Sequence, residues 1–88
     1  MAYQFAFTSR FQKHYKTLPV QGKKQIMKKL KLLAENPLHP SLRTKRIQGT
    51  DDLFECSVNM DIRIIWCYES DKIIILVDVG HHDILKRF

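Results

Sequence analysis

The chain has 88 residues, enough for one modest hydrophobic core, so residues 1–88 are expected to form a single domain. A hydrophobic content of 44% excludes an intrinsically disordered chain, and the longest apolar run, Ile73 to Val77, is too short to span a membrane. The net charge of +6 instead favours a polyanionic or acidic partner, such as a nucleic acid.

Two helices are predicted in the first half of the chain, after a short strand. Residues 3–7 alternate apolar and other side chains, which indicates a half-buried strand. The next segment, 8–18, begins with a capping threonine, repeats apolar residues at helical spacing and stops at Pro19. A second helix is expected over 20–35, ended by Asn36 and Pro37, with an apolar stripe. That stripe comprises Ile26, Met27, Leu30 and Leu33.

The second half predicts a loop and three strands. Residues 38–52 contain prolines, a glycine and a basic cluster, and are expected to be loop. The ranges 53–58, 62–68 and 73–79 are expected to be strands, joined by tight turns. The order is therefore β-α-α-β-β-β. It predicts an α+β fold in which two antiparallel helices pack on one face of a small, mostly antiparallel sheet.

Matching the apolar faces of the three strands predicts their registers, because a slip of one residue would expose a whole core face. The first pair of strands is expected to place Phe54 opposite Trp66 and Ser57 opposite Arg63. The second pair is expected to place Arg63 opposite Asp78. Ser57, Arg63 and Asp78 would then form a polar row on the face away from the helices, with His82 just beyond it on the same side.

Arg63 is the first candidate for function. An arginine in the middle of an apolar strand must face solvent or an anion, and its planar fork suits phosphate. The alternative is an ordinary ion pair with Asp78 across the strands. His82 can transfer protons near neutral pH, although His81 and His82 can also be a polar strand end before a helix. Glu55, on the same face, is either a general base or a solvated sheet residue.

Basic residues are concentrated in residues 1–50, which hold eleven lysines and arginines and one acid. Arg43, Lys45 and Arg46 in the loop add to the lysines of the second helix, and together they predict a polyanion-binding surface. The two cysteines lie outside any CxxC pattern and the four histidines lack zinc-ligand spacing. No secretory signal opens the chain. We therefore expect a cytoplasmic protein with reduced thiols and no metal, small-molecule cofactor or membrane partner.

The element order and four segments resemble the RelE/ParE superfamily, the toxins of type II toxin–antitoxin systems. The segments are the loop 36–40, the stretch 42–49, the run Asp61-Ile62-Arg63-Ile64-Ile65-Trp66, and the ending Val79-Gly80-His81-His82-Asp83. RelE-type members enter the ribosomal A site and cut mRNA without a metal, by attack of the RNA 2′-OH on the adjacent phosphate. ParE-type members inhibit DNA gyrase instead. The resemblance implies an mRNA endonuclease whose partners are the ribosome, mRNA and an acidic antitoxin. A gyrase inhibitor and a catalytically silent RNA- or partner-binding relative remain the alternatives.

The resemblance also implies roles for particular residues. Arg63 matches the family's phosphate-holding arginine, and His82 falls where RelE-type members place a catalytic arginine or histidine. Phe88 falls near the aromatic residue that packs on the nucleotide. Glu55 and Ser57 stand where RelE has lysines, so Glu55 is expected to act as the base beside His82. The expected RNA-binding residues are Arg43, Lys45, Arg46, Ser57, His81 and Phe88.

Overall fold

The computed structural model describes residues 2–88, with the side chain of Arg87 excepted. Its elements follow the predicted order, with a short added strand and two short 3-10 helices. They are β1 (Gln4–Phe7), α1 (Ser9–Thr17), α2 (Val20–Glu35), η1 (Pro40–Leu42), β2 (Lys45–Arg46), β3 (Phe54–Ser57), β4 (Ile62–Tyr68), β5 (Ile73–His81) and η2 (His82–Arg87). None of the helices in this part of the chain has the length and apolar character that a membrane span requires.

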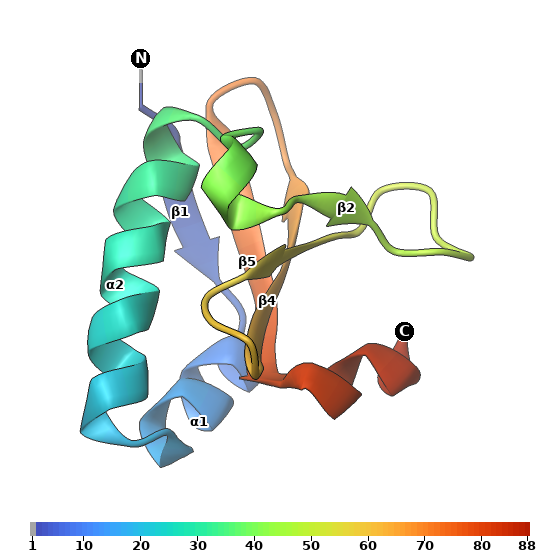
Figure 1. The fold of residues 1–88 in the computed structure, drawn as a ribbon. Helices are drawn as coiled ribbons and strands as arrows, with labels where there is room; N and C mark the ends of the chain where they lie inside the picture. Colours follow the sequence, from blue (N-terminus) through green and yellow to red (C-terminus); the bar gives the residue numbers. More distant parts are fainter. Residues whose placement is uncertain (1) are drawn as a thin grey trace.

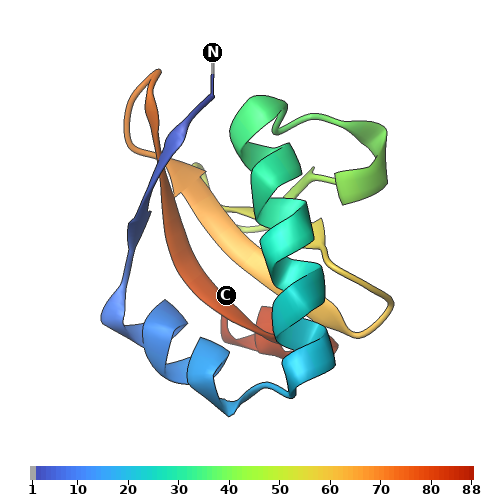
Figure 2. The same ribbon diagram turned by 90° about the vertical axis from the view of Figure 1, so that its left-hand side faces the viewer.

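The strands form one sheet in the order β1-β5-β4-β3-β2 (Figure 1). β1 runs parallel to β5, and the other neighbours are antiparallel. In Figure 2, β1 leads directly into α1 at one end of the sheet, and α2 then runs back along the sheet. The predicted α+β fold, with two helices packed on a mostly antiparallel sheet, is confirmed.

Thr8 joins β1, α1 and β5. Its side-chain oxygen accepts a hydrogen bond from the Phe11 amide at 3.0 Å, which caps α1 as the sequence predicts. Its hydroxyl also donates to the Val77 carbonyl at 2.6 Å, which ties the start of α1 to β5. α1 therefore lies beside β5 where β1 ends.

The main core lies between the two helices and the sheet. Phe11 of α1 and the predicted stripe of α2 meet Ile64 and Trp66 of β4 there. The stripe has one exception, because Met27 is about half exposed, at 51%. Gly22 lies where α2 crosses the start of β4. A Cβ there would lie 3.0 Å from Ile62 Cδ1, so the Ile62 side chain would have to shift to accept a larger residue.

The β3–β4 register is as predicted, with Phe54 opposite Trp66 and Ser57 opposite Arg63. The β4–β5 register is not. Trp66 pairs with Leu76, and a bulge then shifts the pairing so that Ile65 faces Asp78 and Arg63 faces Gly80. The prediction that Arg63 faces Asp78 is therefore wrong. Nearly every residue from 73 to 79 is apolar, so the alternation that set the other registers was absent here.

The face of the sheet away from the helices, where the polar row was predicted, is partly covered by apolar side chains. Ile65 on this face is completely buried, in a second small core with Ile47 and Ile84. Half-buried Leu53, Val77, Leu85 and Phe88 pack around that core. η2 thus covers part of the sheet on the side away from α2 (Figure 1). Near the β3–β4 turn, Ser57 and Arg63 stay partly accessible on this face.

Candidate nucleic-acid interface

Arg63 is held at the β3–β4 turn by main-chain oxygens. Its Nη1 donates to the Asn59 carbonyl at 2.7 Å and to the Ile62 carbonyl at 3.2 Å. Asn59 shapes the turn, because its Oδ1 accepts from the amides of Asp61 at 2.8 Å and Ile62 at 2.7 Å. No carboxylate of the described residues forms an ion pair with Arg63. Its charge is therefore available to an incoming anion.

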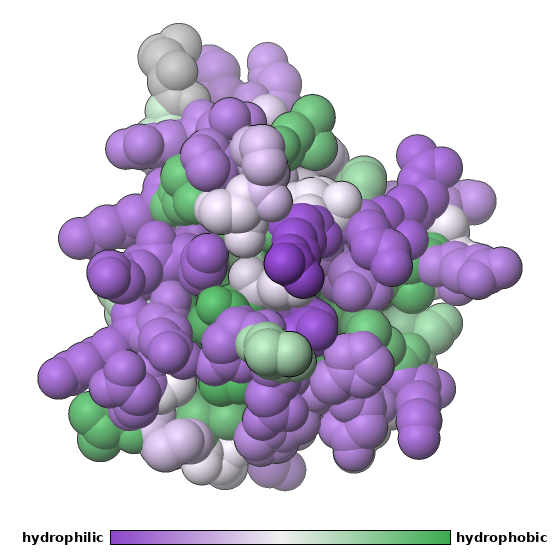
Figure 3. All heavy atoms as spheres, in the orientation of Figure 1, coloured by the Kyte–Doolittle hydropathy of each residue, from purple (hydrophilic) through white to green (hydrophobic). Residues whose placement is uncertain are grey.

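A pocket of about 280 Å³ surrounds this guanidinium. Three basic side chains line it from different parts of the fold: Lys29 from α2, Arg43 from the end of η1, and Arg63 from β4. The other lining residues are Ser41, Ser57, Val58, Asn59 and Met60, so the lining contains no carboxylate. Three cations with hydroxyl and amide donors beside them suit a phosphate group. Figure 3, which looks onto α2 and η1, shows that hydrophilic side chains cover most of this face.

Arg43 occupies an unusual backbone conformation. Its φ of 51° and ψ of 46° lie in the left-handed region, where a side chain other than glycine is strained. It is the C-cap of η1, and its amide donates to the Pro40 carbonyl at 3.1 Å. Strained residues that keep a large side chain cluster at functional sites. The strain is consistent with a binding role for this guanidinium.

The junction between β5 and η2 is held by Asp61. Its Oδ2 lies 2.5 Å from Nδ1 of His81. This hydrogen bond from His81 is the main cause that lowers the pKa of Asp61, and a hydrogen bond from the His82 backbone amide acts in the same direction. His82 itself is exposed at the start of η2 and is not among the residues lining the Arg63 pocket.

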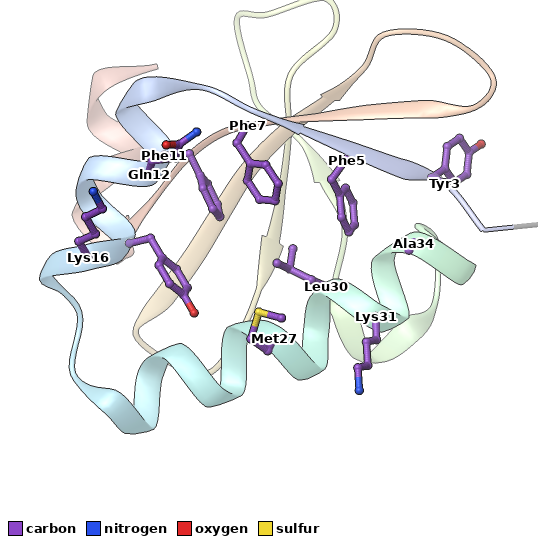
Figure 4. Close-up of a pocket in the computed structure, with 11 residues that line it drawn as sticks. Tyr3, Phe5, Phe7, Phe11, Gln12, Lys16, Met27, Leu30, Lys31 and Ala34 are labelled. Carbon is purple, nitrogen blue, oxygen red and sulfur yellow. The ribbon is translucent and has the colours of Figure 1, made fainter.

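A different kind of surface lies between α1, α2 and β1. A groove of about 580 Å³ is lined by aromatic and aliphatic side chains, with lysines at its rim (Figure 4). Phe7 and Met27 in this groove are each about half exposed, at 50% and 51%. Lys16 and Lys31 stand at its margins. The remaining lining residues are Tyr3, Phe5, Phe11, Gln12, Tyr15, Leu30 and Ala34.

Comparison with known proteins identifies the family. The model of the family described as "Bacterial toxin of type II toxin-antitoxin system, YafQ" matches residues 3–87. The chain belongs to the YafQ toxin family. No curated protein matches the chain significantly.

Solved structures share the fold of this YafQ-family toxin at low sequence identity. The E. coli DinJ–YafQ toxin–antitoxin complex has a chain that matches with a TM-score of 0.78 and 19% identity, over 97% of this chain and 98% of that one. The archaeal RelE–RelB complex from Pyrococcus horikoshii OT3 has a chain that matches with a TM-score of 0.75 and 20% identity, over 92% of this chain and 96% of that one. A mutant of E. coli RelE in the free state matches with a TM-score of 0.72 and 22% identity, over 91% of this chain and 83% of that one. The chain therefore shares its fold with RelE and YafQ toxins.

The structure separates the residues that the sequence nominated for catalysis and RNA binding. Ser57, Arg43 and Arg63 share the basic pocket. Glu55 is half-buried on the outer face, opposite Lys45 and Ile65. Lys45 and Arg46 are exposed on β2, at the edge of the sheet, and Phe88 packs against the second core. Among the described residues, no group of three histidines, cysteines or acids could hold a metal ion.

Sequence reasoning missed two contributions to this region. Lys29 is one of several lysines on α2, and only the tertiary fold distinguishes it by bringing it to the Arg63 pocket. His14 of α1 contacts the buried Asp78 of β5, 64 residues later in the chain. No local pattern signals either contact. The turn at residues 59–61, by contrast, is expected from the sequence, because asparagine side chains often close such turns.

Proposed function

We propose that this toxin is a metal-independent, ribosome-dependent mRNA endonuclease of the cytoplasm. The observation that carries the proposal is the convergence of Lys29, Arg43 and Arg63 on one pocket without a carboxylate. In the proposed reaction the RNA 2′-OH attacks the adjacent phosphate, which gathers negative charge in the transition state. A pocket of fixed cations stabilises that charge more than the charge of the ground state.

Arg63 is the proposed anion-stabilising residue. It is half-buried and its guanidinium is already oriented by two carbonyls, so it needs little reorganisation when the phosphate binds. Lys29 and Arg43 add charge at the rim, with Ser57 as a neutral donor. Lys45 and Arg46 lie on the outer edge of the sheet, where they would contact the RNA backbone or ribosomal RNA. The sequence predicted Glu55 and His82 as the proton-transfer groups, but neither lines this pocket.

The test uses purified protein, programmed ribosomes and mapping of mRNA 5′ ends. We expect cleavage within translated codons, and a loss of roughly 10²–10³-fold in rate for Arg63→Ala, the size seen when one anion-stabilising donor is removed. Lys29→Ala should also slow cleavage, whereas Lys28→Ala is the matched control, since Lys28 is exposed on α2 outside the pocket. Intact mRNA together with inhibited DNA gyrase would overturn the proposal in favour of a ParE-type activity. If Lys29→Ala and Lys28→Ala changed the cleavage rate equally, the pocket would have no specific role in the reaction.

The apolar groove is the proposed docking surface for the cognate antitoxin. Lysines 16 and 31 at its margins complement carboxylates, so the groove suits an amphipathic helix with an apolar stripe and acidic flanks. The DinJ–YafQ and RelE–RelB structures are complexes of a toxin with its antitoxin. Met27→Asp should abolish neutralisation of growth arrest by the antitoxin while mRNA cleavage persists. Normal neutralisation of this variant would place the antitoxin elsewhere.

A further inference from the structure

A second, smaller pocket lies beside the junction of β5 and η2. Its volume is about 170 Å³. Two imidazoles line it, His14 from α1 and His81 from the end of β5. The other lining residues are Val79, Gly80, Asp83 and Ile84. Side chains from opposite ends of the chain therefore share one accessible cavity.

Each imidazole is oriented by its own carboxylate. Nδ1 of His14 lies 2.6 Å from Oδ1 of Asp78, and Nδ1 of His81 lies 2.5 Å from Oδ2 of Asp61. A carboxylate oxygen is a hydrogen-bond acceptor, so Nδ1 is the natural donor in each pair. Nε2 is then the ring nitrogen left to meet a substrate. This is the arrangement that general acid–base chemistry requires.

The carboxylate that contacts His14 belongs to Asp78, and its burial is unusual. Asp78 is completely buried, and its Oδ1 also accepts from the Val79 amide at 2.8 Å. Its Oδ2 has no hydrogen-bond partner among the described residues. Burying an incompletely satisfied carboxylate is unfavourable, and such groups in folded proteins call for a functional explanation. Orientation of the half-exposed His14 ring provides one.

The Arg63 pocket and the imidazole pocket are lined by residues that pair across β4 and β5. Gly80, in the lining of the imidazole pocket, is the direct partner of Arg63 on β4. Paired residues of antiparallel strands lie about 5 Å apart at Cα. A scissile phosphate bound by Arg63 on its Gly80 side would then have its 2′- and 5′-oxygens toward the imidazoles. Asp83 offers an acceptor there for a ribose hydroxyl.

We infer that His14 and His81 are the proton-transfer pair of the nuclease, an inference that rests on the proposed function. One imidazole takes the proton of the 2′-OH as the 2′-oxygen forms its bond to phosphorus. The other gives a proton to the 5′-oxygen as the bond from phosphorus to that oxygen breaks. The products are a 2′,3′-cyclic phosphate and a 5′-hydroxyl, and exchange of protons with water restores both rings. No metal or redox partner is consumed.

Asparagine variants separate this role from a structural one. The amide nitrogen of asparagine reaches the position of Nδ1, so His14→Asn and His81→Asn keep the hydrogen bonds to Asp78 and Asp61 but lack Nε2. We expect each to slow the cleavage of ribosome-bound mRNA by roughly 10²–10⁴-fold, with unchanged thermal unfolding and ribosome affinity. The bell-shaped pH profile of the wild type should lose one limb in each variant. Asp83, Asp61 and Asp78 are the other ionisable groups around this pocket.

A substrate with sulfur in place of the 5′-oxygen assigns the two roles. Because a thiolate leaves without protonation, this substrate should restore cleavage to the variant that lacks the acid and not to the one that lacks the base. The comparison set is His82→Asn and Glu55→Gln, the groups nominated by the sequence. If His14→Asn and His81→Asn cleave at the wild-type rate while the comparison variants lose activity, the inference is overturned. The proposed nuclease function would still stand. Absence of cleavage by the wild type would instead overturn the proposed function.

Discussion

The left-handed backbone of Arg43 makes a prediction about stability. With φ at 51°, the Cβ of an L-residue crowds the next carbonyl oxygen at a cost of about 1–2 kcal/mol, which glycine avoids. Arg43→Gly and Arg43→Ala remove the same guanidinium and differ only in this Cβ. The greater freedom of glycine in the unfolded chain offsets part of the gain. We expect the glycine variant to be the more stable of the two, by about 1 kcal/mol.

Thermal unfolding measures this difference. For a domain of this size, about 1 kcal/mol shifts the unfolding temperature by roughly 4–8 °C. The control is the same pair of variants at Lys28, an exposed position within α2, where alanine should be the more stable by about 1 kcal/mol. Both Arg43 variants should lose cleavage activity equally. An alanine variant at least as stable as the glycine variant would refute the left-handed conformation and the argument built on its strain.

Three further predictions concern the second core, the junction and the thiols. Ile65→Ala should lower the free energy of unfolding by about 2–5 kcal/mol in chemical denaturation, because Ile65 is fully buried beneath η2. A loss below about 0.5 kcal/mol would mean that η2 does not cover this side chain. The hydrogen bond from His81 lowers the pKa of Asp61 in the folded protein. The ionised carboxylate therefore stabilises the fold at pH values above its unfolded pKa of about 4. This stabilisation is lost as the pH falls through the lower pKa of the folded state. The gap in unfolding temperature between wild type and Asp61→Asn should therefore narrow as the pH falls below the unfolded pKa, and a gap that widens on acidification would contradict the sign. Burial raises the pKa of Cys56 to about 12, so mass spectrometry should find an alkylating reagent on the half-exposed Cys67 well before Cys56.

Local patterns in the sequence were sufficient for the helices and for one strand pair. Thr8 and Pro19 mark the two ends of α1, and the apolar stripe of α2 carries most of its contact with the sheet. The β3–β4 register followed from alternation alone, since Cys56 and Ile64 must both face the core. These features depend on neighbours within a few residues, which is the range that periodicity and capping describe.

The tertiary structure decided everything that depends on distant contacts. The apolar run of β5 contains no alternation, so only packing could choose its face, introduce the bulge and bury Asp78 against His14. Lys29, Arg43 and Arg63 come from three separate elements, and no spacing along the chain predicts that they line one pocket. The sequence thus determined the two long helices, the four main strands, the basic character and the family resemblance. The fold determined which of many charged side chains meet, because burial and pairing are properties of segments brought together in space.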